Sequence, residues 1–101
     1  MSYLCYCELS GHIPKFLSNI STLVYLDMAI NKFTGSIPQE LSQLTCLQTL
    51  YLYENELSGP IPPSLSNIST LVDLEITTNK FIGSIPQELG QLASLQTLYL
   101  H

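Results

Sequence analysis

A repeat of 24 residues runs through this chain and constrains its fold more than any other feature. Asparagines recur at that spacing, at Asn31, Asn55 and Asn79. A glycine and an Ile-Pro pair follow each asparagine at fixed distances, and apolar residues, mostly leucines, fill fixed positions between them. Because a unit this short cannot bury its apolar face alone, consecutive units must stack into a solenoid. A solenoid presents an extended surface, which favours binding over catalysis.

One repeat, from Leu71 to Leu92, indicates the order of the elements. Residues 71–76 alternate apolar and polar side chains, which is typical of a short strand with one buried face. Asn79 stands at the following bend, where its side-chain amide is expected to satisfy exposed backbone groups. Gly83 permits a close approach or an unusual backbone conformation, and Pro86 starts a short helical turn. The predicted unit is strand, turn, extended return and short helix, with the strands of successive units parallel.

Composition excludes several classes of function. Among 101 residues there are only 3 cations, all of them lysines, against 8 acids, and the net charge is −5. Nucleic acids and anionic membranes both require a basic surface. No stretch approaches the roughly 20 apolar residues of a membrane span, and the first residues have neither the basic start nor the apolar run of a signal peptide. We therefore predict no nucleic-acid partner and no membrane contact for this segment.

Both ends of the sequence fall within a repeat. Projected by 24 residues, Leu4 takes the position of Met28, and Cys7 takes that of Asn31. Residues 1–101 are therefore expected to form one array of about four repeats, cut within a repeat at both ends and without caps.

The three cysteines have structural interpretations. Cys7 would fill an asparagine position, Cys46 a position held elsewhere by threonine or serine, and Cys5 would face outward. Their disulfide pairing is left open. Cys5, Cys7 and His12 lack the fourth ligand that tetrahedral zinc requires, so neither a metal site nor a cofactor is predicted.

The repeat resembles the plant-type leucine-rich repeat over essentially the whole chain. On one unit the pattern reads Leu71-x-x-Leu74-x-Ile76-x-x-Asn79-x-Phe81-x-Gly83-x-Ile85-Pro86-x-x-Leu89-x-x-Leu92. The Gly-x-Ile-Pro element, which distinguishes this class of leucine-rich repeat, recurs four times starting at Gly11. The resemblance implies an α/β fold, namely a right-handed solenoid or horseshoe with a parallel concave β-sheet and short 3-10 or helical segments on the convex side.

The same resemblance implies a function in recognition. Members of this family form the extracellular, ligand-sensing arrays of plant receptor-like kinases and receptor-like proteins, at the outer side of the plasma membrane. A peptide, a small hormone or a protein co-receptor would then bind the concave face, and any kinase domain would lie outside this chain. Two alternatives remain open: a secreted inhibitor of the polygalacturonase-inhibiting type, and a truncated gene product without independent activity.

Strand positions between the leucines predict the binding surface, because they line the concave face. A spacing of 24 residues places Tyr3, Asp27, Tyr51, Glu75 and Tyr99 in one ladder of alternating aromatic and acidic side chains. Tyrosine also suits strands for structural reasons, but on a free face it supplies rigid amphipathic contact area. The predicted ligand-binding residues are Tyr25, Asp27, Thr49, Tyr51, Tyr53, Asp73, Glu75 and Tyr99.

The convex side carries a different motif. Asn19-Ile20-Ser21 and Asn67-Ile68-Ser69 both match the acceptor sequence for N-glycosylation. The two are predicted glycosylation sites, placed away from the concave face, whereas the repeat asparagines are not followed by such a sequence.

The spacing of two acidic residues also allows a catalytic interpretation. Asp27 and Glu75 are expected two strands apart, about 9.6 Å, near the upper end of the carboxylate separation in inverting glycosidases. However, Tyr51 stands between them, and an open sheet offers no pocket to raise the pKa of one acid. The chain itself is predicted not to be an enzyme.

Overall fold

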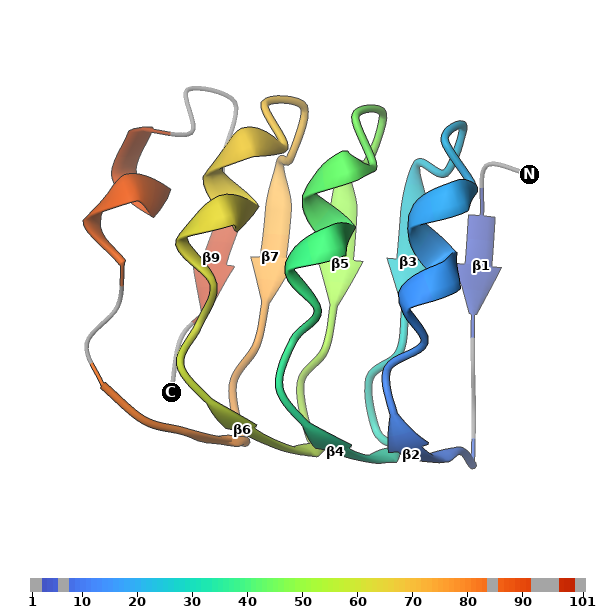
Figure 1. The fold of residues 1–101 in the computed structure, drawn as a ribbon, viewed down its shortest axis with the longest axis vertical. Coiled ribbons are helices and arrows are strands. Elements are labelled where there is room, and N and C mark those ends of the chain that lie inside the picture. The colour runs from blue at the N-terminus through green and yellow to red at the C-terminus, as the bar shows by residue number, and fades with distance from the viewer. Residues whose placement is uncertain (1–2, 6–7, 84–85, 92–96, 100–101) are drawn as a thin grey trace.

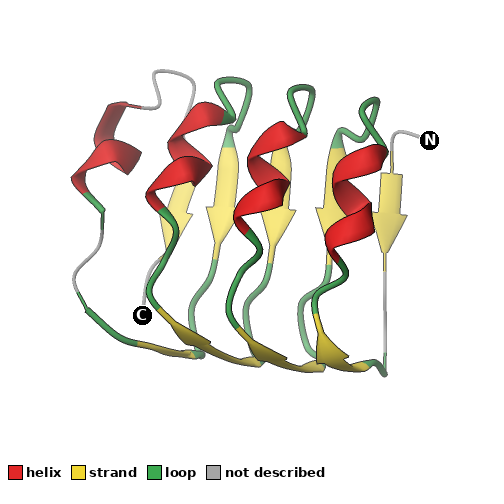
Figure 2. Ribbon diagram, viewed as in Figure 1, coloured by secondary structure: helices red, strands yellow, loops and turns green. Residues whose placement is uncertain are grey.

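The computed structural model describes residues 3–5, 8–83, 86–91 and 97–99, and it confirms the predicted leucine-rich-repeat solenoid (Figure 1). Each complete coil contains a strand, a bend, a second short strand and a 3-10 helix, in that order. The long row of strands lies on one side of the molecule and the helices on the other, with the second strands along one edge (Figure 2).

Within the described residues, the concave sheet contains five parallel strands in the order β1-β3-β5-β7-β9. Their bounds are Tyr3–Cys5, Tyr25–Asp27, Thr49–Tyr51, Asp73–Glu75 and Thr97–Tyr99. From β3 to β7 the paired residues lie one repeat apart, as Asp27, Tyr51 and Glu75 do. In each of these three strands the central leucine is buried and its two neighbours are half-buried, which confirms the predicted alternation.

The first strand departs from the sequence projection. β1 pairs with β3 as Tyr3 with Tyr25, Leu4 with Leu26 and Cys5 with Asp27. The 24-residue projection, which puts Tyr3 beside Asp27 and Leu4 beside Met28, is therefore wrong for this strand. Each residue of β1 therefore pairs two positions earlier in the next coil than the projection expects.

A shorter bend explains this shift. Leu9 and Phe33 remain equivalent, since the N–H of each donates to the Oδ1 of an asparagine 22 residues further on. The chain therefore reaches Leu9 from β1 with two residues fewer than the next coil uses. Consistently, the left-handed residue of the bend is Glu8 in the first coil and Ile30 in the second. The prediction that Cys7 fills an asparagine position lies outside the described residues.

The extended return forms a second parallel sheet, which the sequence analysis did not anticipate. As far as the chain is described, its strands run in the order β2-β4-β6-β8. Their bounds are Ser10–His12, Lys32–Gly35, Glu56–Gly59 and Lys80–Phe81. Neighbouring strands pair at a spacing of 22 residues, as Thr34 with Glu56 shows. Each strand is thus displaced by two residues relative to the sequence repeat.

In the described part of the chain, four 3-10 helices cover the convex side. Their bounds are Lys15–Asn19 (η1), Gln39–Gln43 (η2), Pro63–Asn67 (η3) and Gln87–Gln91 (η4). A proline precedes each helix, and its carbonyl accepts the first turn's hydrogen bond, for example from Leu41 to Pro38 at 3.2 Å. The predicted role of the Ile-Pro pair as the start of a short helical turn is therefore confirmed.

The glycine that recurs in each coil has a positive φ. Gly83 has a φ of 80° and open space where a Cβ would lie, so its requirement is conformational. At Gly35, with a φ of 78°, an added Cβ would in addition collide with the ring of His12. Both of the reasons considered from the sequence therefore occur, in different coils.

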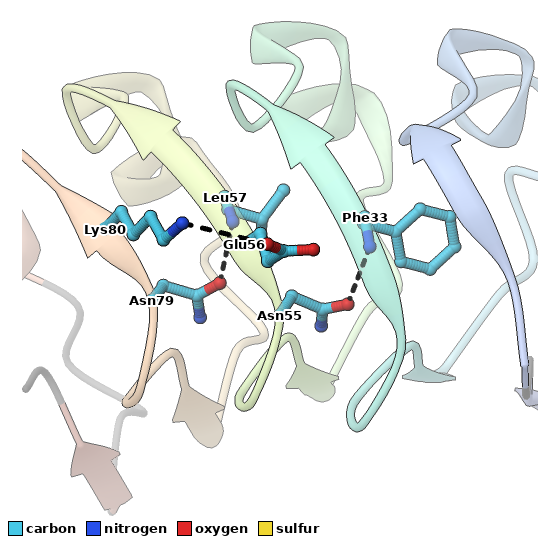
Figure 3. A network of polar contacts seen from close by, with 6 residues as sticks. All are labelled: Phe33, Asn55, Glu56, Leu57, Asn79 and Lys80. Carbon is cyan, nitrogen blue, oxygen red and sulfur yellow. Dashed lines mark hydrogen bonds and ion pairs between the residues drawn. The ribbon is translucent and has the colours of Figure 1, made fainter.

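Asparagines connect one coil to the next, as predicted. The Oδ1 of Asn55 accepts the N–H of Phe33 at 3.1 Å, which links β4 to the following coil (Figure 3). The Nδ2 of Asn55 donates to the carbonyls of Met28 and Leu52, both at 3.0 Å. Asn79 repeats this arrangement one coil later, with Leu57 as the donor at 3.0 Å (Figure 3). Each side chain therefore satisfies backbone groups of two coils.

The residue before each asparagine has a left-handed conformation although none is glycine. The φ values are 56° for Ile30, 56° for Glu54 and 57° for Thr78. This region is unfavourable for side chains branched at Cβ, such as isoleucine and threonine. The asparagine bonds hold the bend in this conformation despite its cost.

The core is a continuous stack of apolar side chains between the sheet and the helices. Leu26, Leu50 and Leu74 have no exposed surface, and Leu41 and Leu65 are equally buried beneath the helices. Among the described residues, no helix has the length and apolar character needed to cross a bilayer.

We expect Asn55→Ala to reduce the free energy of unfolding by about 3 kcal/mol or more, because it leaves several buried backbone groups without partners. Urea denaturation of the chain measures this change. Gln43→Ala, at an exposed position on η2, is the matched control and is expected to change stability by less than about 0.5 kcal/mol. Equal effects of the two substitutions would contradict the structural role of Asn55.

We expect Ile30→Asn to stabilise the chain by about 1 kcal/mol, because asparagine tolerates the left-handed region better than a Cβ-branched residue. Ile82 provides the control, since it is equally exposed, at 64%, but is not among the residues with positive φ in the described part. Ile82→Asn should therefore give no comparable gain in the same thermal unfolding experiment.

Candidate ligand-binding face

The strand positions that flank the buried leucines bring most of the predicted site residues onto one face. In each of β3, β5 and β7, the first and third residues lie outside the core and are half-buried. The first residues of the three strands form one ladder and the third residues form another. Tyr53 follows β5 on the same side of the coil. We call this surface the tyrosine–acid face; it consists of Tyr25, Asp27, Thr49, Tyr51, Tyr53, Asp73 and Glu75.

Tyr51 lies at the centre of the face. Its register partners are Asp27 on one side and Glu75 on the other, as predicted for the ladder. The Tyr25 ring lies edge-on to the Tyr51 ring, with their centroids 5.6 Å apart at an interplanar angle of 81°. The Tyr53 ring is tilted at 59°, with its centroid 5.8 Å from that of Tyr51. The three rings therefore form one contiguous aromatic surface.

A hydrogen bond joins the two ladders diagonally. The Tyr51 hydroxyl donates to Asp73 Oδ2 at 2.7 Å. This bond, followed by burial and the negative charges of Asp73 and Glu75, raises the pKa of Tyr51 above its ordinary value. Tyr51 therefore stays a neutral donor, and its ring orientation is fixed by Asp73. The contact could not be predicted from the 24-residue spacing, because that spacing does not place Tyr51 beside Asp73.

Asp27 has a structural role as well. Its Oδ1 accepts the N–H of Ala29 at 3.0 Å, which stabilises the start of the bend after β3. Nothing in the sequence pattern distinguishes this carboxylate from that of Glu75, so the sequence predicted a binding role alone. One oxygen of Asp27 is thus engaged within the coil.

The negative charges of this face are not neutralised by the chain's lysines. Lys15 on η1 pairs with Glu40 at 3.9 Å, and Lys80 on β8 pairs with Glu56 at 3.7 Å. Lys32 belongs to β4 of the second sheet and is exposed. All three lysines therefore lie away from the concave sheet, and the face carries an uncompensated negative potential.

The pKa of Glu75 is raised above its ordinary value. Burial is the main cause of the raised pKa of Glu75, and the negative charges of Asp73 and Asp27 raise this pKa further. Hydrogen bonding with Tyr51 acts in the opposite direction. Burial also raises the pKa of Tyr53, together with the nearby carboxylates. Both pKa shifts show that these groups are partly removed from solvent and lie close to other negative charges.

The remaining predicted site residues lie as follows. Thr49 is half-buried between Tyr25 and Asp73 in its ladder. Tyr99 pairs with Glu75 through β9, and its side chain lies outside the described residues. The predicted glycosylation residues Asn19 and Asn67 are exposed at the ends of η1 and η3, on the helical side. The described Cys46 is exposed and has a free thiol.

The arrangement does not provide the geometry of a glycosidase. Asp27 and Glu75 lie on the strands to either side of β5. Tyr51 of β5 is the register partner of both acids and lies between them. A scissile bond flanked by the two acids would have to occupy the same space. The face offers aromatic contact area, hydrogen-bond acceptors and negative charge, which are properties of a binding surface.

Comparison with known proteins finds similarity to the repeat. The family model described as Leucine Rich Repeat matches residues 22–44 and 46–68. The Receptor kinase-like protein Xa21 of Oryza sativa subsp. japonica is 49% identical over 46 residues, which cover 45% of this chain and 4% of that protein. Receptor-like protein EIX1 of Solanum lycopersicum is 40% identical over 61 residues, or 54% of this chain and 6% of the relative.

Solved structures agree with these relatives. The leucine-rich-repeat ectodomain of the Arabidopsis receptor kinase HAESA, in complex with an IDA peptide hormone ligand, superposes with a TM-score of 0.93 at 43% identity. The superposition covers 99% of this chain but 17% of that structure. The chain therefore corresponds to a small part of each of these proteins.

We expect Glu75→Gln to raise the melting temperature at neutral pH. Because the folded-state pKa of Glu75 is raised, the folded state binds more protons than the unfolded state above pH 4.5. Stability due to this group is thus lost as the pH rises from about 4.5 through the folded-state pKa. The gain of Glu75→Gln should be present at pH 7 and absent below pH 4.

Melting curves from pH 3 to pH 8 test this expectation. Glu88→Gln, at an exposed position on η4, is the control for loss of one negative charge. If Glu88→Gln gives the same pH-dependent gain, the effect comes from net charge and the local interpretation of Glu75 is wrong.

Proposed function

We propose that this chain, an array of plant-type leucine-rich repeats, recognises a ligand on its tyrosine–acid face as part of the extracellular sensing region of a plant receptor. The observation that carries the proposal is a contiguous aromatic surface, centred on Tyr51, that is flanked by acids and lacks any lysine. Tyrosine is enriched among the hot-spot residues of binding interfaces, and such residues cluster near the centre of the contact.

The chemistry of the face favours an extended ligand with basic groups among apolar ones. Carboxylates of Asp27 and Glu75 lie one strand to each side of Tyr51, so about 4.8 Å separates each acid position from the aromatic one. A cation placed between an acid and the Tyr51 or Tyr53 ring gains both charge pairing and a cation–π contact. The net charge of −5 would also steer such a ligand toward the protein.

Similarity to solved receptors supports a peptide or protein partner. One similar structure, HAESA, was solved with a peptide hormone, and another contains both that peptide and the co-receptor SERK1. By analogy we infer that a peptide or small hormone contacts the concave face and that a co-receptor is a further partner. The parent protein would then display this array outside the plasma membrane, and any kinase activity would reside beyond the chain described.

The alternatives have less support. A secreted inhibitor of the polygalacturonase-inhibiting type would use the same concave face, but the similar proteins reported above are receptors. A truncated product without activity would not need an acidic aromatic face that its own lysines leave unpaired. We therefore prefer the receptor function.

We expect Tyr51→Ala and Glu75→Ala each to weaken ligand binding by more than about 1 kcal/mol. The probe is a set of synthetic extended peptides in which lysine alternates with leucine, and the affinity is measured by fluorescence anisotropy. Tyr51 supplies the central ring and Glu75 an acid that no lysine neutralises, so both substitutions should weaken binding. Glu75→Ala should in addition make the affinity less dependent on salt.

Two controls make the experiment decisive. Gln43→Ala, on the convex side, should leave the affinity unchanged. Peptides of the same length with glutamate in place of lysine should bind more weakly. If the two peptide sets bind equally, or if folded Tyr51→Ala and Glu75→Ala proteins retain full affinity, the proposal for this face is refuted.

A further inference from the structure

The two acceptor motifs on the convex side occupy equivalent and accessible positions. Asn19 is the last residue of η1 and Asn67 the last residue of η3. Both asparagines are exposed, and so are Ser21 and Ser69, the hydroxyl residues of the two motifs. Within the described part of the chain, neither Asn19 nor Asn67 makes a side-chain hydrogen bond. Their amides are therefore available for modification.

The backbone presents both motifs in the same way. The residue after each asparagine turns inward, where Ile20 is half-buried and Ile68 fully buried. The N–H of Ile20 donates to Leu17 at 3.1 Å, and that of Ile68 donates to Leu65 at 3.1 Å. This inward isoleucine points the flanking asparagine and serine to solvent. A bulky modification at either asparagine therefore meets no part of the core.

One of the two sites has an aromatic neighbour. Phe16 precedes Asn19 by three residues in η1, and its side chain is 59% exposed. In a 3-10 helix, side chains at i and i+3 eclipse one another, so the Phe16 ring and Asn19 lie along one line of the helix. The corresponding residue of η3 is Ser64, which is not exposed. An exposed phenylalanine is thus present beside one acceptor asparagine only.

We propose that Asn19 and Asn67 carry N-linked glycans, and that the first sugar on Asn19 covers the exposed ring of Phe16. In the reaction, Asn Nδ2 loses a proton and bonds to C1 of N-acetylglucosamine. The bond from that C1 to the diphosphate of a lipid-linked oligosaccharide donor breaks, and the lipid diphosphate leaves. The inference rests on the proposed function only in that the chain would enter the secretory pathway.

Secretion of the whole chain from plant cells, behind an added leader peptide, tests the two sites. Mass spectrometry of the intact protein should show two glycans. Ser21→Ala should remove the glycan from Asn19 while leaving the asparagine in place, and Ser21→Thr should retain it. Secreted wild-type and Ser21→Thr proteins without sugar at Asn19 would overturn the proposal, and absence of sugar at Asn67 would overturn its second half.

The intervening coil offers a gain-of-glycan test. η2 ends at Gln43, Leu44 turns inward, and Thr45 already stands at the hydroxyl position. If exposure at the end of this helix determines modification, Gln43→Asn should acquire a glycan in a protein that lacks the two natural acceptors. Failure of folded, secreted protein to do so would contradict the assignment of this position as an accessible acceptor.

Melting temperatures test the contact with Phe16. In Asn67→Gln, where sugar remains at Asn19 only, complete enzymatic deglycosylation should lower the melting temperature by about 2–4 °C. Trimming to a single N-acetylglucosamine should keep most of the stability, because the first sugar makes the contact. In Phe16→Ala the loss on deglycosylation should be at most half as large, and Phe16→Tyr should restore it.

A matched control is built into the chain. In Asn19→Gln the remaining glycan lies at Asn67, whose neighbour is Ser64, and deglycosylation should change the melting temperature by less than about 1 °C. Equal losses at the two sites would refute the packing on Phe16. Peptide binding by sugar-free bacterial protein tests the concave face independently, so failure of either proposal is distinguishable from failure of the other.

Discussion

The fold depends on a single type of side chain at the bend of each coil. An asparagine amide accepts a backbone N–H from one coil with its oxygen, while its nitrogen donates to carbonyls on both sides. At the bend, neither sheet supplies these partners, and unpaired buried backbone groups are costly. The same bonds hold Ile30 and Thr78 in a left-handed conformation that their side chains disfavour. Removing the amide would therefore disturb the backbone as well as the contact between coils.

The concave face inherits its order from this constraint. Since the bends fix the length of each coil from β3 onward, the strands align residue for residue, and Tyr51 comes to lie between Asp27 and Glu75. The aromatic surface and the unpaired acids are consequences of this alignment. On the opposite side, the same periodicity places Asn19 and Asn67 at the ends of equivalent helices. Because of the repeat, the proposed ligand-binding residues lie on the concave sheet and the proposed glycosylation sites lie on the helical side.

Much of this arrangement could be predicted from the sequence, because a strict period determines which residues stack. The period predicted the parallel strands, the asparagine contacts, the proline-initiated turns and the neighbours of Tyr51. It failed in the first coil, where a bend two residues shorter shifts Tyr3 from Asp27 to Tyr25. Contacts between ladders, such as Tyr51 with Asp73, depend on side-chain rotamers and not on spacing. The second sheet was missed because an extended segment does not reveal whether its hydrogen bonds go to water or to a neighbour.

The different registers of the two sheets have a geometric consequence for any elongated partner. Along the concave sheet, a line drawn across the strands meets the same place in the motif at every coil from β3 onward. Along the second sheet the pairing advances two residues per coil, so equivalent places drift by about 6.6 Å at each step. A rod-shaped molecule lying across the strands would therefore contact equivalent residues of every coil on the concave sheet. On the second sheet, the same molecule would contact a different position of the repeat at each coil, and equivalent residues would lie along a diagonal.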